Sequence, residues 1–199
     1  MKQLIKYSEC RKLKPVSMDN NQGKGFFPFR VLSNLFPELD ESLTHDATWR
    51  ELLRDAAKQV CAVHLGIFVE PYLSFVLDGS KTVESRFSVN KCAPWGRVFA
   101  GDILLMKASG GPIVGVGRIA HVWSYRLEPR TWKDIRKEFT ISLRAQDPGF
   151  WASRSKASYA TLMRMEDVRP LPNLPCHKRD RRGWVLLSER ANSPLWDPS

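Results

Sequence analysis

The sequence has 199 residues, a length that suits one domain of about 150 residues with an extension, or one slightly enlarged domain. With 43% hydrophobic residues and seven tryptophans, the chain can bury a sizeable core, which excludes disorder throughout its length. Its 31 basic and 21 acidic side chains give a formal net charge of +10, so we expect a polyanionic partner, nucleic acid before an anionic membrane surface.

The positive charge is concentrated in one part of the chain. Residues 118–190 carry 16 basic and eight acidic side chains, a net charge of +8 out of the total of +10. A local excess favours a basic face over charge that is spread evenly. No stretch approaches the roughly 20 apolar residues of a membrane-spanning helix, and the first residues lack the apolar core of a secretory signal. We therefore expect no membrane contact and a cytoplasmic location.

The cysteines give no sign of a metal site. Cys10, Cys61, Cys92 and Cys176 are widely spaced and form no Cys-x-x-Cys pair. Cys176 precedes His177, but no second pair of ligands follows at zinc-finger spacing. P-loop and dinucleotide-binding motifs are absent as well. We predict free thiols, no metal and no cofactor.

The first part of the chain is predicted to lie outside the main domain. Residues 1–25 are polar and rich in turn-forming residues, which is typical of a tail. Residues 26–39 are rich in aromatic residues and prolines, and we expect them to lie irregularly against the core. A helix is predicted over residues 48–62, because Thr48 and Glu51 form a capping-box pattern ahead of an apolar face.

The hydrophobic period then changes from helical to strand-like. Residues 62–70 place apolar side chains at every second position, which predicts a strand. Residues 71–79 follow as a short helix, with Pro71 in its first turn and Gly79 directly after its end. An extended conformation resumes over residues 81–87.

The remaining elements complete a sheet. Residues 96–109 and 112–125 are predicted to be two neighbouring strands joined as a hairpin, and residues 131–139 a short helix. Two more strands are predicted over residues 159–172 and 183–189. Five or six short strands with small helices between them predict an α+β fold, built on a small, mostly antiparallel β-barrel with short flanking helices and an N-terminal helical extension.

The order of these motifs resembles that of the ASCH domain, a β-barrel family related to the PUA RNA-binding fold. The resemblance lies in a strand, a Pro-Tyr-Leu helix start and a charged turn, followed by a Gly-Asp entry to the next strand. The residues that carry it are Gly79, Lys81, Thr82, Glu84, Arg86, Gly101 and Asp102. It covers roughly residues 62–190. We predict an N-terminal extension over residues 1–60, an ASCH/PUA-like barrel domain over 61–190 and a tail over 191–199.

The resemblance implies a cleft beside the Lys- and Glu-bearing segment and RNA or a nucleotide as ligand. Some small members are similar to amidohydrolases that remove the acyl group from N4-acetylcytidine, using a Lys, a Thr and a later Glu. Lys81 matches the Lys, Glu84 stands where the family has the Thr, and Thr82 lies beside Lys81; Asp134 or Glu138 could supply the later carboxylate. Other members are regarded as ribonucleases or as nucleic-acid binders. If the chain is an enzyme, the expected catalytic residues are Lys81, Thr82 and Glu84.

The charged turn, residues 79–86, can also be interpreted from physical chemistry alone. On an extended segment Thr82, Glu84 and Arg86 project to one side, while Lys81, at the start of the segment, can still reach Glu84. In a partly buried cleft Lys81 and Glu84 would pair, since a lone buried charge is costly. Lys81 or Arg86 could then bind a phosphate, and Glu84 a base N–H. The alternative is an exposed turn with a surface ion pair.

Two further clusters are candidate nucleic-acid contacts. The first is a basic segment suited to gripping a phosphate backbone, or otherwise a solvated loop, and it consists of Lys178, Arg179, Arg181 and Arg182. The second interleaves aromatic residues with basic and hydroxyl side chains, as in single-strand binding surfaces, and includes Trp123, Ser124 and Arg154. Aromatic residues at strand spacing also occur in cores, so both interpretations of the second cluster stay open.

The sequence leaves three functions to compare. The leading hypothesis is binding of nucleic acid, RNA in the first place, or of a modified nucleotide, through the charged turn and the basic segment. The alternative is a hydrolase that acts on an acylated cytidine or on RNA, with Lys81 essential. A third is a protein adaptor that uses residues 26–39. No oligomeric state is predicted.

Overall fold

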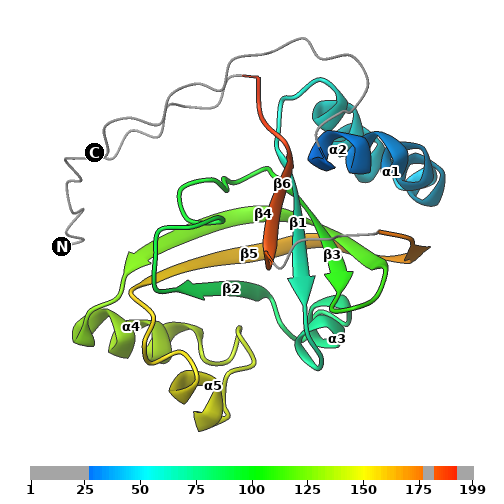
Figure 1. Cartoon of the computed structure of the whole chain (residues 1–199). Helices are drawn as coiled ribbons and strands as arrows, with labels where there is room; N and C mark the ends of the chain where they lie inside the picture. Colours follow the sequence, from blue (N-terminus) through cyan, green and yellow to red (C-terminus); the bar gives the residue numbers. More distant parts are fainter. Residues whose placement is uncertain (1–26, 177–181, 192–199) are drawn as a thin grey trace.

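The computed structural model describes residues 27–176 and 182–191, and within these ranges it contains five helices and six strands (Figure 1). The helices are α1 (Phe27–Leu43), α2 (Ala47–Ala57), α3 (Tyr72–Leu77), α4 (Pro129–Phe139) and α5 (Pro148–Ala152). The strands are β1 (Val63–Phe68), β2 (Val83–Ser88), β3 (Ile103–Ala108), β4 (Ile113–Arg126), β5 (Tyr159–Leu174) and β6 (Trp184–Ser188). The basic side chains of Lys178, Arg179 and Arg181 lie outside the described residues.

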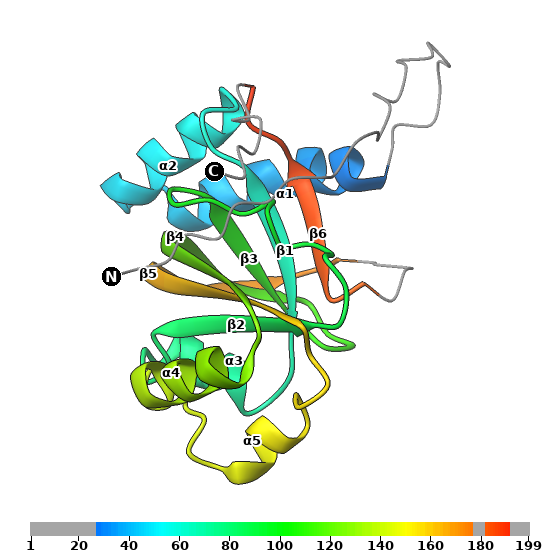
Figure 2. The same ribbon diagram turned by 90° about the vertical axis from the view of Figure 1, so that its left-hand side faces the viewer.

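The strands form one sheet in the order β2-β5-β4-β3-β1-β6. Every neighbouring pair is antiparallel except β1 and β3, which are parallel. The long strands β4 and β5 pair along most of their length with three register shifts, and such bulges bend a strand and increase its twist. The sheet therefore curls into a half-barrel (Figure 2). The predicted α+β fold with a mostly antiparallel, barrel-like sheet is confirmed, and β3 and β4 form the predicted neighbouring pair.

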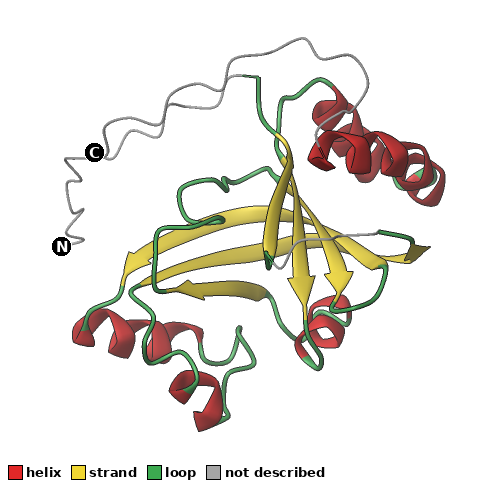
Figure 3. Ribbon diagram, viewed as in Figure 1, coloured by secondary structure: helices red, strands yellow, loops and turns green. Residues whose placement is uncertain are grey.

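One face of the sheet is covered at its two ends by helices (Figure 3). At one end α1 and α2 share a hydrophobic core with β1, β3, β6 and the adjoining parts of β4 and β5. At the other end α4 and α5 pack on β2 and on the far halves of β4 and β5. The opposite, concave face holds a separate core to which α3 and the β2–β3 connection contribute. This concave face carries the candidate site.

The expectation that residues 26–39 lie irregularly is wrong, because α1 runs as a helix from Phe27 to Leu43. Its buried leucines recur three or four positions apart, as one face of a helix requires, and they are Leu32, Leu35, Leu39 and Leu43. Pro37 lies inside the helix with an exposed side chain. Burial of the leucine face outweighs the hydrogen bond that Pro37 removes. The division at residue 60 stays a prediction, although a single core crosses it.

The predicted helix cap at Thr48 is also wrong, by two residues, and the helix ends at Ala57 and not at residue 62. Asp46 caps α2, and its carboxylate accepts the Trp49 backbone N–H at 3.1 Å. The sequence contains a suitable cap at either position, and the burial of Trp49 against the sheet selects Asp46. In the part of the chain that the structure describes, no helix combines the length and apolar character needed to cross a bilayer.

Candidate anion-binding site

The charged turn is held by the end of α3. Gly79 has a φ of +77°, so it occupies the left-handed conformation expected directly after a helix. The Asp78 carboxylate accepts the Ser80 backbone N–H at 2.8 Å, and the Lys81 backbone N–H donates to Phe75 at 2.7 Å. These contacts place Lys81 just before β2, pointed at the edge of the sheet.

Lys81 and Glu84 form a buried ion pair, with only 2% and 6% of their surfaces exposed. Lys81 Nζ donates a hydrogen bond to Glu84 Oε2, and Arg86 Nε lies 3.0 Å from Glu84 Oε1. One carboxylate therefore faces two cations. This geometry is that of a structured polar centre and not of an exposed surface ion pair.

The surroundings change the proton affinity of both partners. Burial alone raises the pKa of Glu84, but Lys81 and Arg86 outweigh burial and hold this pKa below its usual value. Burial lowers the pKa of Lys81, the contact with Glu84 partly offsets this, and the charges of Arg86 and Arg154 add to the lowering, so that the pKa stays below its usual value. Glu84 is therefore ionised near neutral pH, and Lys81 loses its proton more readily than an exposed lysine does.

Arg86 reaches across the open side of the half-barrel. Its guanidinium lies 5.0 Å from the ring centre of Phe68 on β1 and 5.3 Å from that of Trp184 on β6. Its Nη1 donates to the Gly183 carbonyl at 3.3 Å. Arg86 Nε is buried and, despite its closeness to Glu84, has no acceptor aligned for a hydrogen bond. We treat the contact with Glu84 as an ion pair that leaves this N–H unsatisfied.

Arg154 adds a third cation nearby, on the helix-covered side of the sheet, where it packs on Phe150 of α5. Its guanidinium lies 3.7 Å from the ring centre of Phe150, and Nη1 donates to the Phe150 carbonyl at 2.7 Å. Burial lowers the pKa of Arg154, the Tyr72 and Glu84 side chains partly offset that lowering, and Arg86 reinforces it. Lys81, Arg86 and Arg154 therefore interact electrostatically around the single carboxylate of Glu84. We call these four residues the cationic cluster.

The pairing of the strands shows which other predicted residues share its face. Arg86 lies opposite Thr161 on β5, and Thr161 lies opposite Ser124 on β4, so these three form one row on the concave face. Trp123 points to the opposite face, where its ring lies 5.0 Å from that of Phe139. The structure thus brings Ser124 to the row of Arg86 and packs Trp123 into the core beneath α4.

The remaining predicted site residues lie in different surroundings. Thr82 has an exposed side chain, whereas Lys81 beside it is buried. Burial raises the pKa of Tyr125 to about 12, and the charges of Glu138 and Asp134 add to this; Tyr125 packs with α4 on the face opposite to Glu84. Of the catalytic groups that the resemblance implies, Glu84 contacts Lys81, whereas the Thr82 side chain is exposed and Asp134 and Glu138 lie near Tyr125.

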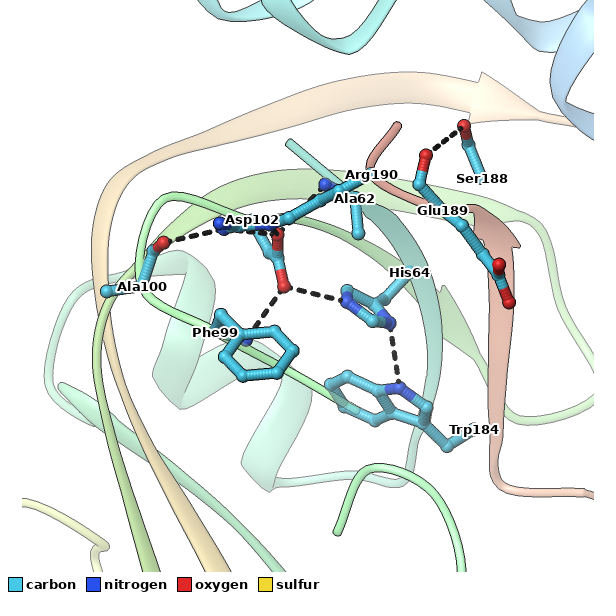
Figure 4. Close-up of polar contacts among 9 residues, drawn as sticks. All are labelled: Ala62, His64, Phe99, Ala100, Asp102, Trp184, Ser188, Glu189 and Arg190. Carbon is cyan, nitrogen blue, oxygen red and sulfur yellow. Dashed lines mark hydrogen bonds and ion pairs between the residues drawn. The ribbon is translucent and has the colours of Figure 1, made fainter. Parts of the chain in front are cut away.

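A second polar centre, which the sequence analysis did not assign, lies next to Trp184 (Figure 4). Asp102 has no exposed surface, and its carboxylate accepts hydrogen bonds from the backbone N–H groups of Ala62 and Phe99 at 2.9 and 2.8 Å. It also accepts two from Arg190, at 3.0 and 2.8 Å. These bonds join the starts of β1 and β3 to the segment after β6. The Gly-Asp motif at the start of β3 was the only signal in the sequence that pointed to this centre.

The fourth partner of Asp102 is His64, whose tautomer follows from its neighbours. The indole Nε1–H of Trp184 donates to His64 Nδ1 at 3.2 Å, and an indole nitrogen can only donate. His64 Nδ1 is therefore an acceptor, and Nε2 carries the proton that is given to Asp102 at 3.1 Å. With both nitrogens engaged inside the protein, this centre supports the fold and positions Trp184 beneath Arg86.

No group of three or more potential metal ligands occurs among residues 27–176 and 182–191. Cys61 is buried, and burial raises the pKa of its thiol to about 11. The chemistry of the site is thus that of cations, one carboxylate and aromatic rings.

The fold is similar to that of ASCH from Zymomonas mobilis. Its crystal structure superimposes with a TM-score of 0.50 at 9% sequence identity, covering 62% of this chain and 86% of that one. The crystal structure of one mutant form of that protein gives a TM-score of 0.51 at 10% identity and covers 64% of this chain and 91% of that one. The crystal structure of a second mutant form gives a TM-score of 0.50 at 12% identity and covers 64% of this chain and 89% of that one. No family model and no curated protein matches the sequence. The chain therefore has an ASCH-like fold, as the motif order predicts, and a likeness at this identity concerns the fold alone.

Proposed function

We propose that the protein binds nucleic acid, RNA in the first place, and that a phosphate group of the ligand lies against the cationic cluster. The observation that carries this proposal is the charge balance: Lys81 and Arg86 engage the two oxygens of one carboxylate, and Arg154 is a third cation that interacts electrostatically with it. A positive excess that is partly sheltered from water attracts an anion more strongly than exposed lysines do. The ASCH-like fold, related to the PUA RNA-binding fold, supports the same ligand class.

The basic segment before β6 belongs to the same proposal. Gly183, whose carbonyl accepts a hydrogen bond from Arg86, directly follows Arg182 in the chain. The segment with Lys178, Arg179, Arg181 and Arg182 therefore ends beside the cluster. We assign these four residues to further contacts along the phosphate backbone.

Binding of a labelled single-stranded RNA, followed by fluorescence anisotropy over a series of salt concentrations, tests this function. We expect the logarithm of the affinity to fall linearly with the logarithm of the salt concentration. Arg86→Gln and Arg154→Gln should each weaken binding and flatten the slope by about 0.7, the value for one phosphate contact on a single strand.

Arg164→Gln is the matched control for charge. Arg164 is a half-exposed arginine on β5, at a register position between two concave-face methionines, so it projects from the opposite face. We expect this variant to bind RNA as the wild-type protein does. Affinity that does not change with salt, or an equal loss in all three variants, would count against the proposed site.

Hydrolysis is a second candidate function, and one observation favours it. Because its pKa is lowered, Lys81 forms a neutral, nucleophilic amine more easily than an exposed lysine does, and Glu84 lies within hydrogen-bond reach as a proton acceptor. Thr82, with its exposed side chain, could act only on a substrate that reaches the outer side of the turn. Incubation with N4-acetylcytidine and with labelled RNA tests this function, using Lys81→Arg as the variant that keeps a cation. Equal turnover in the variant, or none in the wild-type protein, rules out Lys81 catalysis.

A further inference from the structure

Trp95 differs from the other buried tryptophans of the described chain in having no partner for its indole N–H. Trp49 donates to the Asp167 carbonyl at 2.9 Å, Trp151 to the Ala145 carbonyl at 2.8 Å and Trp184 to His64. Trp95 is only 8% exposed, and its Nε1 is buried without an acceptor. A buried donor without an acceptor costs stability, so its persistence points to a partner other than the protein.

The segment that carries Trp95 is ordered and lies over the concave face. The Trp95 backbone N–H donates to Cys92 at 3.0 Å, and the Arg97 N–H donates to Pro94 at 3.0 Å. Val98, three residues further on, is buried in the concave-face core. In Figure 1 this connection between β2 and β3 crosses in front of β4. Trp95 is therefore held in place, and its unpaired donor does not result from a loose loop.

Trp95 packs on the row of the concave face that neighbours the row of Arg86. The Trp95 ring is 4.9 Å from that of Tyr159, and Tyr159 lies opposite Ser88 on β2. The neighbouring row on the same face pairs Arg86 with Thr161, two residues away on both strands. Arg86 Nε and Trp95 Nε1 are the two buried side-chain donors without a hydrogen-bond acceptor among the described residues, and they belong to adjacent rows.

We propose that Arg86 and Trp95 bind one nucleotide unit, with the phosphate at Arg86 and an acceptor atom of the base at Trp95 Nε1. This inference rests on the proposed function and goes beyond it, since a phosphate-only site has no use for a second donor on the next row. Rows two residues apart on a strand are separated by roughly 7 Å, which one nucleotide can span between its phosphate and its base. The indole donates only, so the base atom that it meets is a carbonyl oxygen or an unprotonated ring nitrogen. The Tyr159 ring beside Trp95, with Lys91 Nζ 5.8 Å from its centre, offers an aromatic wall for the base.

Binding of short RNA and of an abasic analogue tests the inference. The probes are single-stranded RNA tetramers of each of the four nucleotides, and an abasic ribose-phosphate tetramer of equal charge. The wild-type protein should bind at least one RNA tetramer more tightly than the abasic tetramer. Trp95→Phe keeps an aromatic ring against Tyr159 and removes the N–H, and we expect it to reduce that preference by about threefold to tenfold, the effect of one hydrogen bond. Its affinity for the abasic tetramer should not change.

Trp132→Phe is the matched control, because Trp132 stacks on Phe87 beneath α4 and α5, on the other face of the sheet. It should bind every probe as the wild-type protein does. RNA binding that Trp95→Phe leaves unchanged overturns the role of Trp95, while the proposed function stands. Absence of binding to all RNA and abasic probes overturns both.

Stability provides a second, independent measurement. Trp95→Phe and Trp151→Phe both lose part of a buried ring, but only Trp151→Phe also loses a hydrogen bond. Trp95→Phe should therefore unfold at a higher urea concentration than Trp151→Phe does. A loss in Trp95→Phe as large as that in Trp151→Phe would assign the indole N–H to a contact within the protein and overturn the inference.

Discussion

Among single residues, Glu84 has the largest electrostatic effect on stability at the candidate site, because its carboxylate neutralises part of the charge of two cations. We expect Glu84→Gln to lower the free energy of unfolding by about 3–5 kcal/mol at neutral pH, because Lys81 would be left buried without a counterion. This loss of stability should shrink as the pH rises towards about 10. In the folded variant Lys81 loses its proton at a lower pH than in the unfolded chain, and a neutral Lys81 no longer places an unpaired charge in the interior.

Urea unfolding at several pH values measures this effect. Glu166→Gln serves as the control, because it breaks the pairs of a half-exposed carboxylate with Arg118 and Arg164 and should cost less than about 1 kcal/mol. Equal costs in the two variants would mean that the Lys81–Glu84 pair is no more consequential than a surface contact.

The lowered pKa of Asp102 predicts how the stability of the protein depends on pH. Burial raises its pKa, but the hydrogen bonds from His64 and from the backbone outweigh burial and leave the pKa below the usual value. The folded state therefore binds this proton more weakly than the unfolded chain, in which the pKa is about 3.9. The stabilisation by Asp102 is complete above that pH and is lost as the pH falls through the lower folded value. Part of the stability of the wild-type protein should thus disappear below about pH 4.

Unfolding curves between neutral and strongly acid pH check this prediction. Asp102→Asn replaces an acceptor by a donor inside the centre of Figure 4, so the variant should be less stable at pH 7 and lose less on further acidification. Asp134→Asn, which changes an exposed carboxylate on α4, should show the acid dependence of the wild-type protein. An unchanged acid dependence in Asp102→Asn would contradict the assignment.

At the scale of elements, α1 is predicted to be part of the folded unit, because its leucine face shares one core with the sheet. Leu39 is only 1% exposed, and Leu39→Ala should cost about 2–5 kcal/mol through lost burial and the cavity that remains. Glu38→Ala, on the exposed side of the same helix, should change stability by less than about 0.5 kcal/mol. Thermal unfolding of both variants measures the difference, and an equally small effect of both would make α1 a loosely attached extension.

The elements that the sequence predicts best are those whose signals are local. The alternating apolar residues of β1 and the left-handed Gly79 after α3 are encoded within a few positions, and both were predicted correctly. α1 was missed because its aromatic residues and Pro37 obscure the spacing of the leucines. α5 was missed because its five residues are too few to show a period.

In the candidate site, too, the contacts that could be predicted are those between residues close in sequence. Lys81 and Glu84 are three positions apart, so their pairing could be expected from the turn itself. The meeting of Arg86 with Trp184 depends on how far the sheet curls, which no local pattern encodes. The direction of Trp123 depends on the pleat of β4, which turns Ser124 to the concave side and Trp123 and Tyr125 towards α4.

At the scale of the whole molecule, the half-barrel has an open side between β2 and β6, which are the two edges of the sheet. No ladder of backbone hydrogen bonds joins these edges within the described residues. Arg86 spans the opening, with one hydrogen bond to Gly183 and its guanidinium over the rings of Phe68 and Trp184. The residue that we assign to phosphate binding thus also connects the two edges, and we expect ligand binding to be coupled to the closure of the half-barrel.

This coupling predicts a local effect on hydrogen exchange. Arg86→Met keeps an apolar stem against Phe68 and Trp184 and removes the bond to Gly183, so amides in β2 and β6 should exchange about fivefold faster, as roughly 1 kcal/mol of local opening free energy implies. Amides in β3 and in the centre of β4 should be unaffected, and Arg164→Met should leave all strands as in the wild-type protein. Mass spectrometry of peptides that cover each strand resolves these regions. Faster exchange in every strand would mean that Arg86 supports the fold as a whole. Slower exchange of β2 and β6 when RNA is added to the wild-type protein, but not to Arg86→Met, would show that the ligand closes the same opening that Arg86 spans.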